Sequence, residues 1–207
     1  MFDCPIVTAR QLGVGLALAL LAGCATIPPD HPDNLCAVFE QNRSWYRQAK
    51  RAQARHGTPI HVTMAIMAKE SGFNAHARTR RTYLLWVIPW GHVTTAYGYA
   101  QAKDETWAWY QQQTGRHGAS RSDFGDAVDF IAWYVATAHR ELGISKWDAY
   151  SQYLAYHEGL TGYRRRTYRS QPGLQSRAAA VKALALQYAR QLHSCADELE
   201  RDWWPFW

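Results

Sequence analysis

The spacing of apolar positions along the chain is mainly that of helices. Apolar side chains recur every three or four residues through most of the sequence after residue 33. This spacing predicts helices over about 34–55, 59–70, 101–114, 122–142, 145–158 and 172–199. The links between them are short and no internal repeat is evident. The pattern therefore predicts a single all-α domain of medium-length helices packed orthogonally.

Residues that favour helix ends support several of these boundaries. Thr58 and Pro59 suit the N-cap and the first position of the second helix. Ser145 and Asp148 have the spacing of a capping box. The glycines that follow three of the later segments stand where helices often end, at Gly115, Gly143 and Gly159.

Two segments depart from the helical pattern. Residues 83–90 form an unbroken apolar run inside the irregular stretch 73–96, which predicts a hairpin or lid inserted into the helical domain. Residues 201–207 end in an aromatic cluster, Trp203-Trp204-Pro205-Phe206-Trp207. This tail can contact a membrane interface, a saccharide or the surface of the domain itself.

The N-terminus has the pattern of an export signal. Arg10 precedes an apolar stretch, Leu12 to Ala22, that is too short to span a membrane. The stretch ends in Leu21-Ala22-Gly23-Cys24, which resembles the bacterial lipobox. That resemblance implies cleavage before Cys24 and a lipid anchor on its sulfur, and Ala25 then favours the outer membrane, facing the periplasm. An ordinary signal peptide is the alternative.

The domain plan that follows is a signal peptide over 1–23, a tether over 24–33, a folded domain over 34–200 and the aromatic tail. Two cysteines, Cys36 and Cys195, lie near the two ends of that folded domain. Export would place them in an oxidising compartment, which predicts a disulfide between them. Two buried free thiols are the alternative.

The amino-acid composition and net charge indicate which kinds of molecule the protein can bind. Hydrophobic residues make up 47% and aromatic residues 14% of the 207 positions, which suffices for a packed core. The formal net charge is +6, and residues 1–23 do not change it because Asp3 and Arg10 cancel. A basic exported protein suits an anionic polymer or membrane surface. We expect no nucleic acid as partner, no metal site and no cofactor, because the sequence contains none of the corresponding motifs.

Glu70 is the leading candidate for chemistry. It lies at the end of an apolar helical segment, in Lys69-Glu70-Ser71-Gly72. An apolar environment raises the pKa of a carboxyl group, which suits a general acid near neutral pH. Two further segments follow in order, Tyr97-Gly98-Tyr99-Ala100-Gln101 and Ala155-Tyr156-His157-Glu158-Gly159. Together, the three segments resemble the SLT domain of lytic transglycosylases, which has a lysozyme-like fold and cleaves peptidoglycan.

The resemblance implies a catalytic route for Glu70. As the sole catalytic carboxyl group, it would protonate the glycosidic oxygen between N-acetylmuramic acid (MurNAc) and N-acetylglucosamine (GlcNAc). It would then take a proton from the C6 hydroxyl of MurNAc, which attacks C1 and leaves a 1,6-anhydro sugar. The substrate would be the glycan strands of peptidoglycan, and no cofactor would take part.

The resemblance also proposes residues that bind substrate. Gly98 and Gln101 match the Gly-Leu-Met-Gln motif of the family, and the amide of Gln101 can contact sugar or N-acetyl groups. Ser71 is expected near the cleft, with a plain helix-terminal hydroxyl as the alternative. Tyr97 is either a platform for sugar stacking or a core aromatic residue.

The third segment matches the family's Ala-Tyr-Asn motif only in part. Tyr156 takes the place of the tyrosine that hydrogen-bonds the catalytic carboxyl group. His157 replaces the asparagine, so its contact with substrate is an open question. Glu158 can pair with an arginine of the run 164–166, bind substrate, or act as a second carboxylate, and the first two roles are favoured.

Three other functions stay open at this point. A hydrolytic muramidase on the same fold would use Glu70 with Glu158 or another acid to activate water. A non-catalytic lipoprotein would bind the cell wall through the same cleft. A structural tether would join the outer membrane to the wall without Glu70.

Overall fold

The structure, a computed structural model, describes residues 27–84 and 88–201, without the side chains of 81–91. Its elements are the helices α2 (Leu35–Gln41), α3 (Arg43–His56), α4 (Ile60–Ser71), α5 (Asp104–Thr114), α6 (Phe124–Leu142), α7 (Ala149–Arg165) and α8 (Pro172–Arg201), the 3-10 helix η1 (Thr167–Ser170) and the strands β1 (Arg81–Leu84) and β2 (Ile88–His92). The predicted all-α class with an inserted hairpin is confirmed. No described helix is long and apolar enough to cross a bilayer.

Helix α6 forms the centre of the packing. All but two of its residues from Phe124 to Ala138 are buried, and α3, α4 and α7 pack around it. Trp45 of α3 stacks on Phe124 with 4.1 Å between ring centroids, and Tyr99 meets both rings edge to face. These contacts fix the segment around Tyr99 against the helical core, next to the end of α4.

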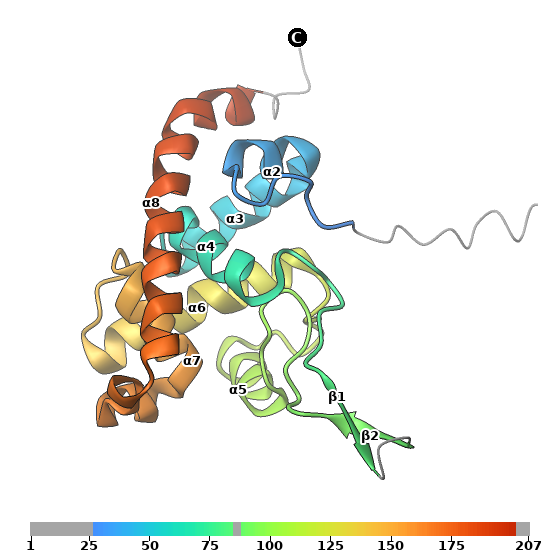
Figure 1. Ribbon diagram of the computed structural model, residues 1–207. Coiled ribbons are helices and arrows are strands. Elements are labelled where there is room, and N and C mark those ends of the chain that lie inside the picture. The colour runs from blue at the N-terminus through green and yellow to red at the C-terminus, as the bar shows by residue number, and fades with distance from the viewer. Residues whose placement is uncertain (1–26, 85–87, 202–207) are drawn as a thin grey trace, which may run out of the picture.

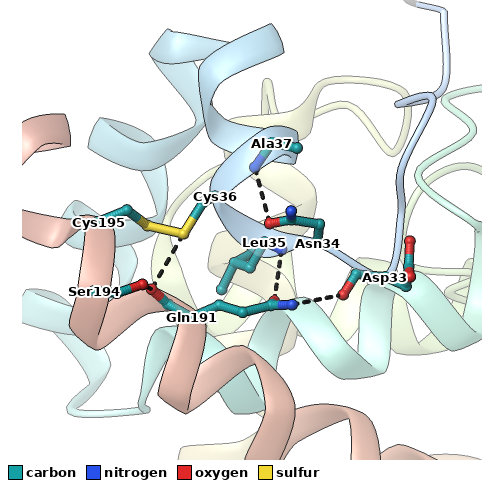
Figure 2. The surroundings of a disulfide bond; sticks show 8 residues. All are labelled: Asp33, Asn34, Leu35, Cys36, Ala37, Gln191, Ser194 and Cys195. Carbon is teal, nitrogen blue, oxygen red and sulfur yellow. Dashed lines mark hydrogen bonds between the residues drawn. A yellow bond between two sulfur atoms is a disulfide. The ribbon is translucent and has the colours of Figure 1, made fainter.

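The long helix α8 runs along one side of the helical body (Figure 1). It packs against α2, α4 and α7. Its C-terminal part is joined to α2 by a disulfide between Cys36 and Cys195, with 6.1 Å between the Cα atoms. Figure 2 shows that Gln191 reinforces this junction, because its side chain accepts from the N–H of Leu35 at 2.9 Å and donates to the carbonyl of Asp33 at 3.1 Å. The predicted disulfide is confirmed.

The inserted segment is a two-stranded antiparallel hairpin that projects away from the helices (Figure 1). At its base, Thr79 donates a hydrogen bond to the carbonyl of Thr94 at 3.1 Å. The hairpin follows α4 and precedes α5 in the chain, and Thr79 and Thr94 at its base line the same cleft as Glu70 of α4.

Several predicted helix boundaries were wrong. The expected helix over 34–55 is divided into α2 and α3 at Asn42, whose φ of −130° and ψ of 69° are not helical. Thr58 is not an N-cap, because its hydroxyl donates to the carbonyl of Ala132 and Pro59 takes the cap position. Asp148, not Ser145, caps α7 by accepting from the N–H of Ser151.

The glycine predictions had mixed outcomes. Gly115 and Gly143 end α5 and α6 in the left-handed conformation, as expected. Gly159 interrupts α7 where the end of a helix was predicted, but its φ of 75° and ψ of 163° are not the left-handed cap conformation, and a second helical segment continues to Arg165. The predicted signal peptide, Cys24 and the aromatic residues Trp203 to Trp207 lie outside the described residues.

Candidate active site

A cleft of about 420 Å³ lies at the end of α4. Glu70 from α4 lines it together with residues from the hairpin base, the start of α5, α6 and α7. The cleft therefore collects residues from all three sequence segments that were singled out, namely Glu70, Gln101, Tyr156, His157 and Glu158.

Glu70 lies in the last turn of α4, where the helix changes from buried to accessible. Residues Val62 to Met67 of this helix are buried, and Gly72 closes it in the left-handed conformation with φ of 58°. Burial raises the pKa of Glu70 from 4.5 to about 7, although the neighbouring Tyr153 side chain and the charges of Arg177 and Lys69 oppose the shift. The group is thus partly protonated at neutral pH and can act as a general acid.

Tyr153 was not predicted as a site residue. It lies on α7, is 2% exposed, and is near enough to Glu70 for each of the two groups to shift the pKa of the other. Burial and the neighbouring charge of Glu70 raise the pKa of the Tyr153 hydroxyl, so this group is a donor at any physiological pH. Its place three residues before Tyr156 on a predicted helix was the available signal, since residues three apart share a helix face.

Tyr156 has a different partner from the one expected. Its hydroxyl donates to the backbone carbonyl of Ala100 at 2.5 Å, not to Glu70. The carboxylate of Glu70 is nevertheless near enough to help burial raise the pKa of the Tyr156 hydroxyl. Tyr156 therefore ties α7 to the Gly98–Gln101 turn while it lines the cleft.

Gly98 is a structural requirement of that turn. Its φ is 76°, and a Cβ atom there would lie 2.1 Å from the carbonyl oxygen of Arg121. The turn is held on the other side by the N–H of Gly98, which donates to the carbonyl of Ala77 at 3.0 Å. Only glycine meets both the conformation and the close approach.

Gln101 lines the cleft at the end of the same turn. Its side-chain Nε2 donates to the carbonyls of Ala77 and Gly98, both at 2.9 Å. Its φ of 48° is unusual for a residue with a side chain. Because the two bonds use both amide hydrogens, a ligand in the cleft would meet the acceptor oxygen of Gln101.

Ser71 and Tyr97 are placed outside the described lining of the cleft. The hydroxyl of Ser71 donates to the carbonyl of Met67 within its own helix at 3.3 Å. The ring of Tyr97 has the guanidinium of Arg78 at 4.3 Å from its centroid, and its hydroxyl is 2.9 Å from Nδ1 of His76. A cation thus occupies a position over the ring where a sugar would stack.

His157 and Glu158 line the cleft next to the break of α7 at Gly159. Nδ1 of His157 lies 3.3 Å from the carboxylate of Glu158. Glu158 also accepts from the hydroxyl of Thr167 and, at 2.9 Å, from Nε2 of Gln171. The bond from Thr167 is the main cause that lowers the pKa of Glu158, so this carboxyl group is ionised at neutral pH.

The expected pairing of Glu158 with the arginine run is not found. Among the ion pairs of the described residues, none joins Glu158 to residues 164–166. The chain turns at Arg166, with φ of 59°, and brings Thr167 and Gln171 to Glu158 instead.

Comparison with known families agrees with this geometry. The model of the transglycosylase SLT domain matches residues 12–195. The chain belongs to the transglycosylase SLT domain family. Membership implies a transglycosylase-type enzyme whose substrate is the glycan strand of peptidoglycan. No curated protein matches the sequence.

Proposed function

We propose that this SLT-domain protein is a peptidoglycan lytic transglycosylase that cleaves the β-1,4 bond between MurNAc and GlcNAc and forms 1,6-anhydro-MurNAc. The observation that carries the proposal is Glu70, a cleft-lining carboxyl group whose pKa is raised to about 7 by burial. A carboxyl group with this pKa can both release and accept a proton near neutral pH, which the two steps of the reaction require.

In the first step, protonated Glu70 gives its proton to the glycosidic oxygen, the bond between that oxygen and C1 of MurNAc breaks, and the GlcNAc part of the strand leaves with the proton. In the second step, its carboxylate takes the proton of the MurNAc C6 hydroxyl, and that oxygen attacks C1 of the same sugar. The attack is intramolecular, so the nucleophile is present at high effective molarity and no water is consumed. This chemistry needs one protein carboxyl group, in contrast to the usual pair of glycosidases.

Glu158 suits the binding of substrate better than a second catalytic role. Three side chains already contact its carboxylate: His157, Thr167 and Gln171. A base that activates water needs a free lone pair directed at that water, and these contacts occupy much of the acceptor capacity of Glu158. The remaining capacity fits hydroxyl or amide groups of a glycan strand.

A hydrolytic muramidase is the alternative, because Glu158 is ionised and lines the same cleft as Glu70. Mass spectrometry of the muropeptides released from purified peptidoglycan separates the two reactions. An anhydro end is one water lighter than a reducing end. Predominantly anhydro ends support the transglycosylase, and predominantly reducing ends refute it. Wall that stays intact with wild-type protein would favour a non-catalytic binding protein.

We further propose that the protein is an outer-membrane lipoprotein anchored through Cys24 and facing the periplasm. The sequence Leu21-Ala22-Gly23-Cys24 supports the anchor. The disulfide between Cys36 and Cys195 fits an oxidising compartment outside the cytoplasm. The substrate of the family is a cell-wall polymer, which is reached from that compartment.

A further inference from the structure

His157 and Glu158 are consecutive residues of α7 whose side chains contact each other in the cleft. Nδ1 of His157 lies 3.3 Å from Oε1 of Glu158. Consecutive side chains of a regular helix point in different directions and do not normally meet. This contact occurs directly before Gly159, whose φ of 75° and ψ of 163° break the helix. The break therefore coincides with a paired imidazole and carboxylate in the cleft.

The two carboxylate oxygens of Glu158 have different partners. Oε2 accepts from the hydroxyl of Thr167 and, at 2.9 Å, from Nε2 of Gln171, whereas Oε1 faces His157. The packing behind the carboxylate is close, because a Cβ atom at Gly162 would lie 3.0 Å from Cβ of Glu158 and 3.2 Å from Oγ1 of Thr167. These contacts fix the carboxylate with Oε1 directed at the imidazole.

The fixed carboxylate selects one tautomer of the imidazole. An ionised carboxylate can only accept hydrogen bonds, and the lowered pKa of Glu158 keeps it ionised at neutral pH. A neutral imidazole has one N–H group, so the bond at one ring nitrogen decides the state of the other. With the proton on Nδ1, Nε2 keeps a free lone pair. Within the described part of the chain Nε2 of His157 has no hydrogen-bond partner, and the side chain is 35% exposed and lines the cleft.

We propose that Glu158 is a positioning residue that holds His157 with its proton on Nδ1, so that Nε2 offers a hydrogen-bond acceptor to a hydroxyl or amide donor of the substrate. Gln101 supports this proposal, because its oxygen is the acceptor that its side chain leaves for the same cleft. Two neutral acceptors suit a glycan strand, whose hydroxyl and N-acetyl groups carry donors. The identity of the ligand rests on the proposed function, but the tautomer does not.

The substitution Glu158→Gln should reverse the tautomer. Nε2 of Gln171 can only donate, so the oxygen of the introduced amide should stay beside it. The amide nitrogen then takes the position of Oε1 and donates to Nδ1 of His157. The imidazole proton moves to Nε2, and the cleft gains a donor where it had an acceptor. Thr167→Val is the matched control, because it removes one contact of the same carboxylate and leaves Oε1 facing Nδ1.

NMR of the full chain with ¹⁵N-labelled histidine measures the tautomer at about pH 8.5, where imidazole is ordinarily neutral. His157→Phe identifies the signals, and contact with the Tyr153 ring, whose centroid is 6.4 Å away, provides a second assignment. We expect the proton on Nδ1 in wild type and Thr167→Val, and on Nε2 in Glu158→Gln. A wild-type proton on Nε2, no change in Glu158→Gln, or an equal reversal in Thr167→Val would overturn the proposal. The wild-type spectrum decides where a variant does not fold.

Sedimentation with intact peptidoglycan measures binding, and every protein in this arm carries Glu70→Gln so that the wall is not cleaved. Glu158→Gln should weaken binding by about three- to tenfold, which corresponds to one hydrogen bond, and Thr167→Val by less than about twofold. His157→Phe has no ring nitrogen, so Glu158→Gln should cause no further loss in that background. A further loss of the same size would mean that Glu158 binds the substrate directly, and it would refute the positioning role.

These measurements separate the proposal from the proposed function. The tautomer is observed without substrate, and binding is observed without cleavage. Reducing ends among the released products would refute the transglycosylase and leave both results standing. A wrong tautomer would refute the role of Glu158 and leave the released products unaffected.

Discussion

Glu70 and Glu158 line the same cleft, and their pKa values are shifted in opposite directions. Burial raises that of Glu70 to about 7, whereas hydrogen bonds, chiefly from Thr167, lower that of Glu158. Environments that separate two carboxyl groups in this way assign them different protonation states at one pH. Near neutral pH the cleft therefore offers one proton donor and one fixed negative charge.

Glu70→Gln should abolish cleavage of peptidoglycan. Glutamine keeps the size and some hydrogen bonds of the side chain but has no acidic proton to transfer to the glycosidic oxygen. We expect activity to fall by about 10²–10⁴-fold or more, with the folded state retained. Release of soluble muropeptides measures the activity, and circular dichroism checks the fold. Near-normal digestion by a folded variant would remove Glu70 from the mechanism.

The same residue makes stability depend on pH. Because folding raises the pKa of Glu70 from 4.5 to about 7, its protonated form is favoured in the folded state. The contribution of protonated Glu70 to the free energy of unfolding is fully present below about pH 4.5 and is lost as pH rises through about 7. The loss is on the order of 3 kcal/mol for a shift of this size.

Glu70→Gln is the control for that measurement, since it removes the titrating group. Urea unfolding at pH 4.5 and pH 8 should show a larger decrease for wild type than for the variant. Taking the difference between the two proteins cancels other titrating groups, such as Asp129, whose pKa is lowered in the folded state. Parallel pH curves for the two proteins would contradict the raised pKa of Glu70.

The sequence predicts those features of the fold that depend on neighbouring residues in the chain. It does not predict those that depend on contacts between elements distant in the chain. Apolar spacing predicted the helical class, because it reports burial within one element. The break at Asn42 could not be read in this way, since the apolar positions continue on both sides of it. The cap of α7 also differed, because Ser145 and Asp148 both favour helix starts and only the packed structure selects Asp148.

The same distinction holds for the candidate site: its residues could be predicted from local motifs, but the contacts between them could not. Glu70, Gln101 and Glu158 were predicted from local motifs, and the structure brings all three to one cleft. The contacts between them depend on how α4, α7 and α8 pack, which local motifs do not encode. For that reason Tyr153 was missed, the hydrogen-bond partner of Tyr156 was assigned incorrectly, and the arginine pair considered for Glu158 is not found among the described residues.

Loss of the disulfide should destabilise the protein. Cys36 and Cys195 are 159 residues apart, so the bond closes a loop that covers most of the folded chain. On the chain-entropy model such a loop contributes about 5 kcal/mol. We expect a reducing agent to lower the midpoint of thermal unfolding of wild type and to leave that of Cys36→Ala/Cys195→Ala unchanged. Equal midpoints for oxidised wild type and the double variant would show that the bond contributes nothing.

Cys24→Ser tests the proposed anchor. A serine hydroxyl does not replace the thiol that would carry the lipid, so the variant should not incorporate radiolabelled palmitate and should leave the membrane fraction. Wild type provides the positive control in the same cells. Continued outer-membrane fractionation of the variant would assign attachment to another part of the chain or to a partner.

The products of Glu158→Gln decide between the two proposed reactions. Glutamine keeps the shape of the side chain but removes its charge, so it weakens the contacts with Thr167 and His157 and cannot act as a base. In a transglycosylase, the C6 hydroxyl is already positioned at high effective molarity and water competes poorly. We therefore expect a modest loss of activity with anhydro ends still dominant. Reducing ends that dominate in wild type and disappear in Glu158→Gln would instead identify Glu158 as the base of a hydrolase.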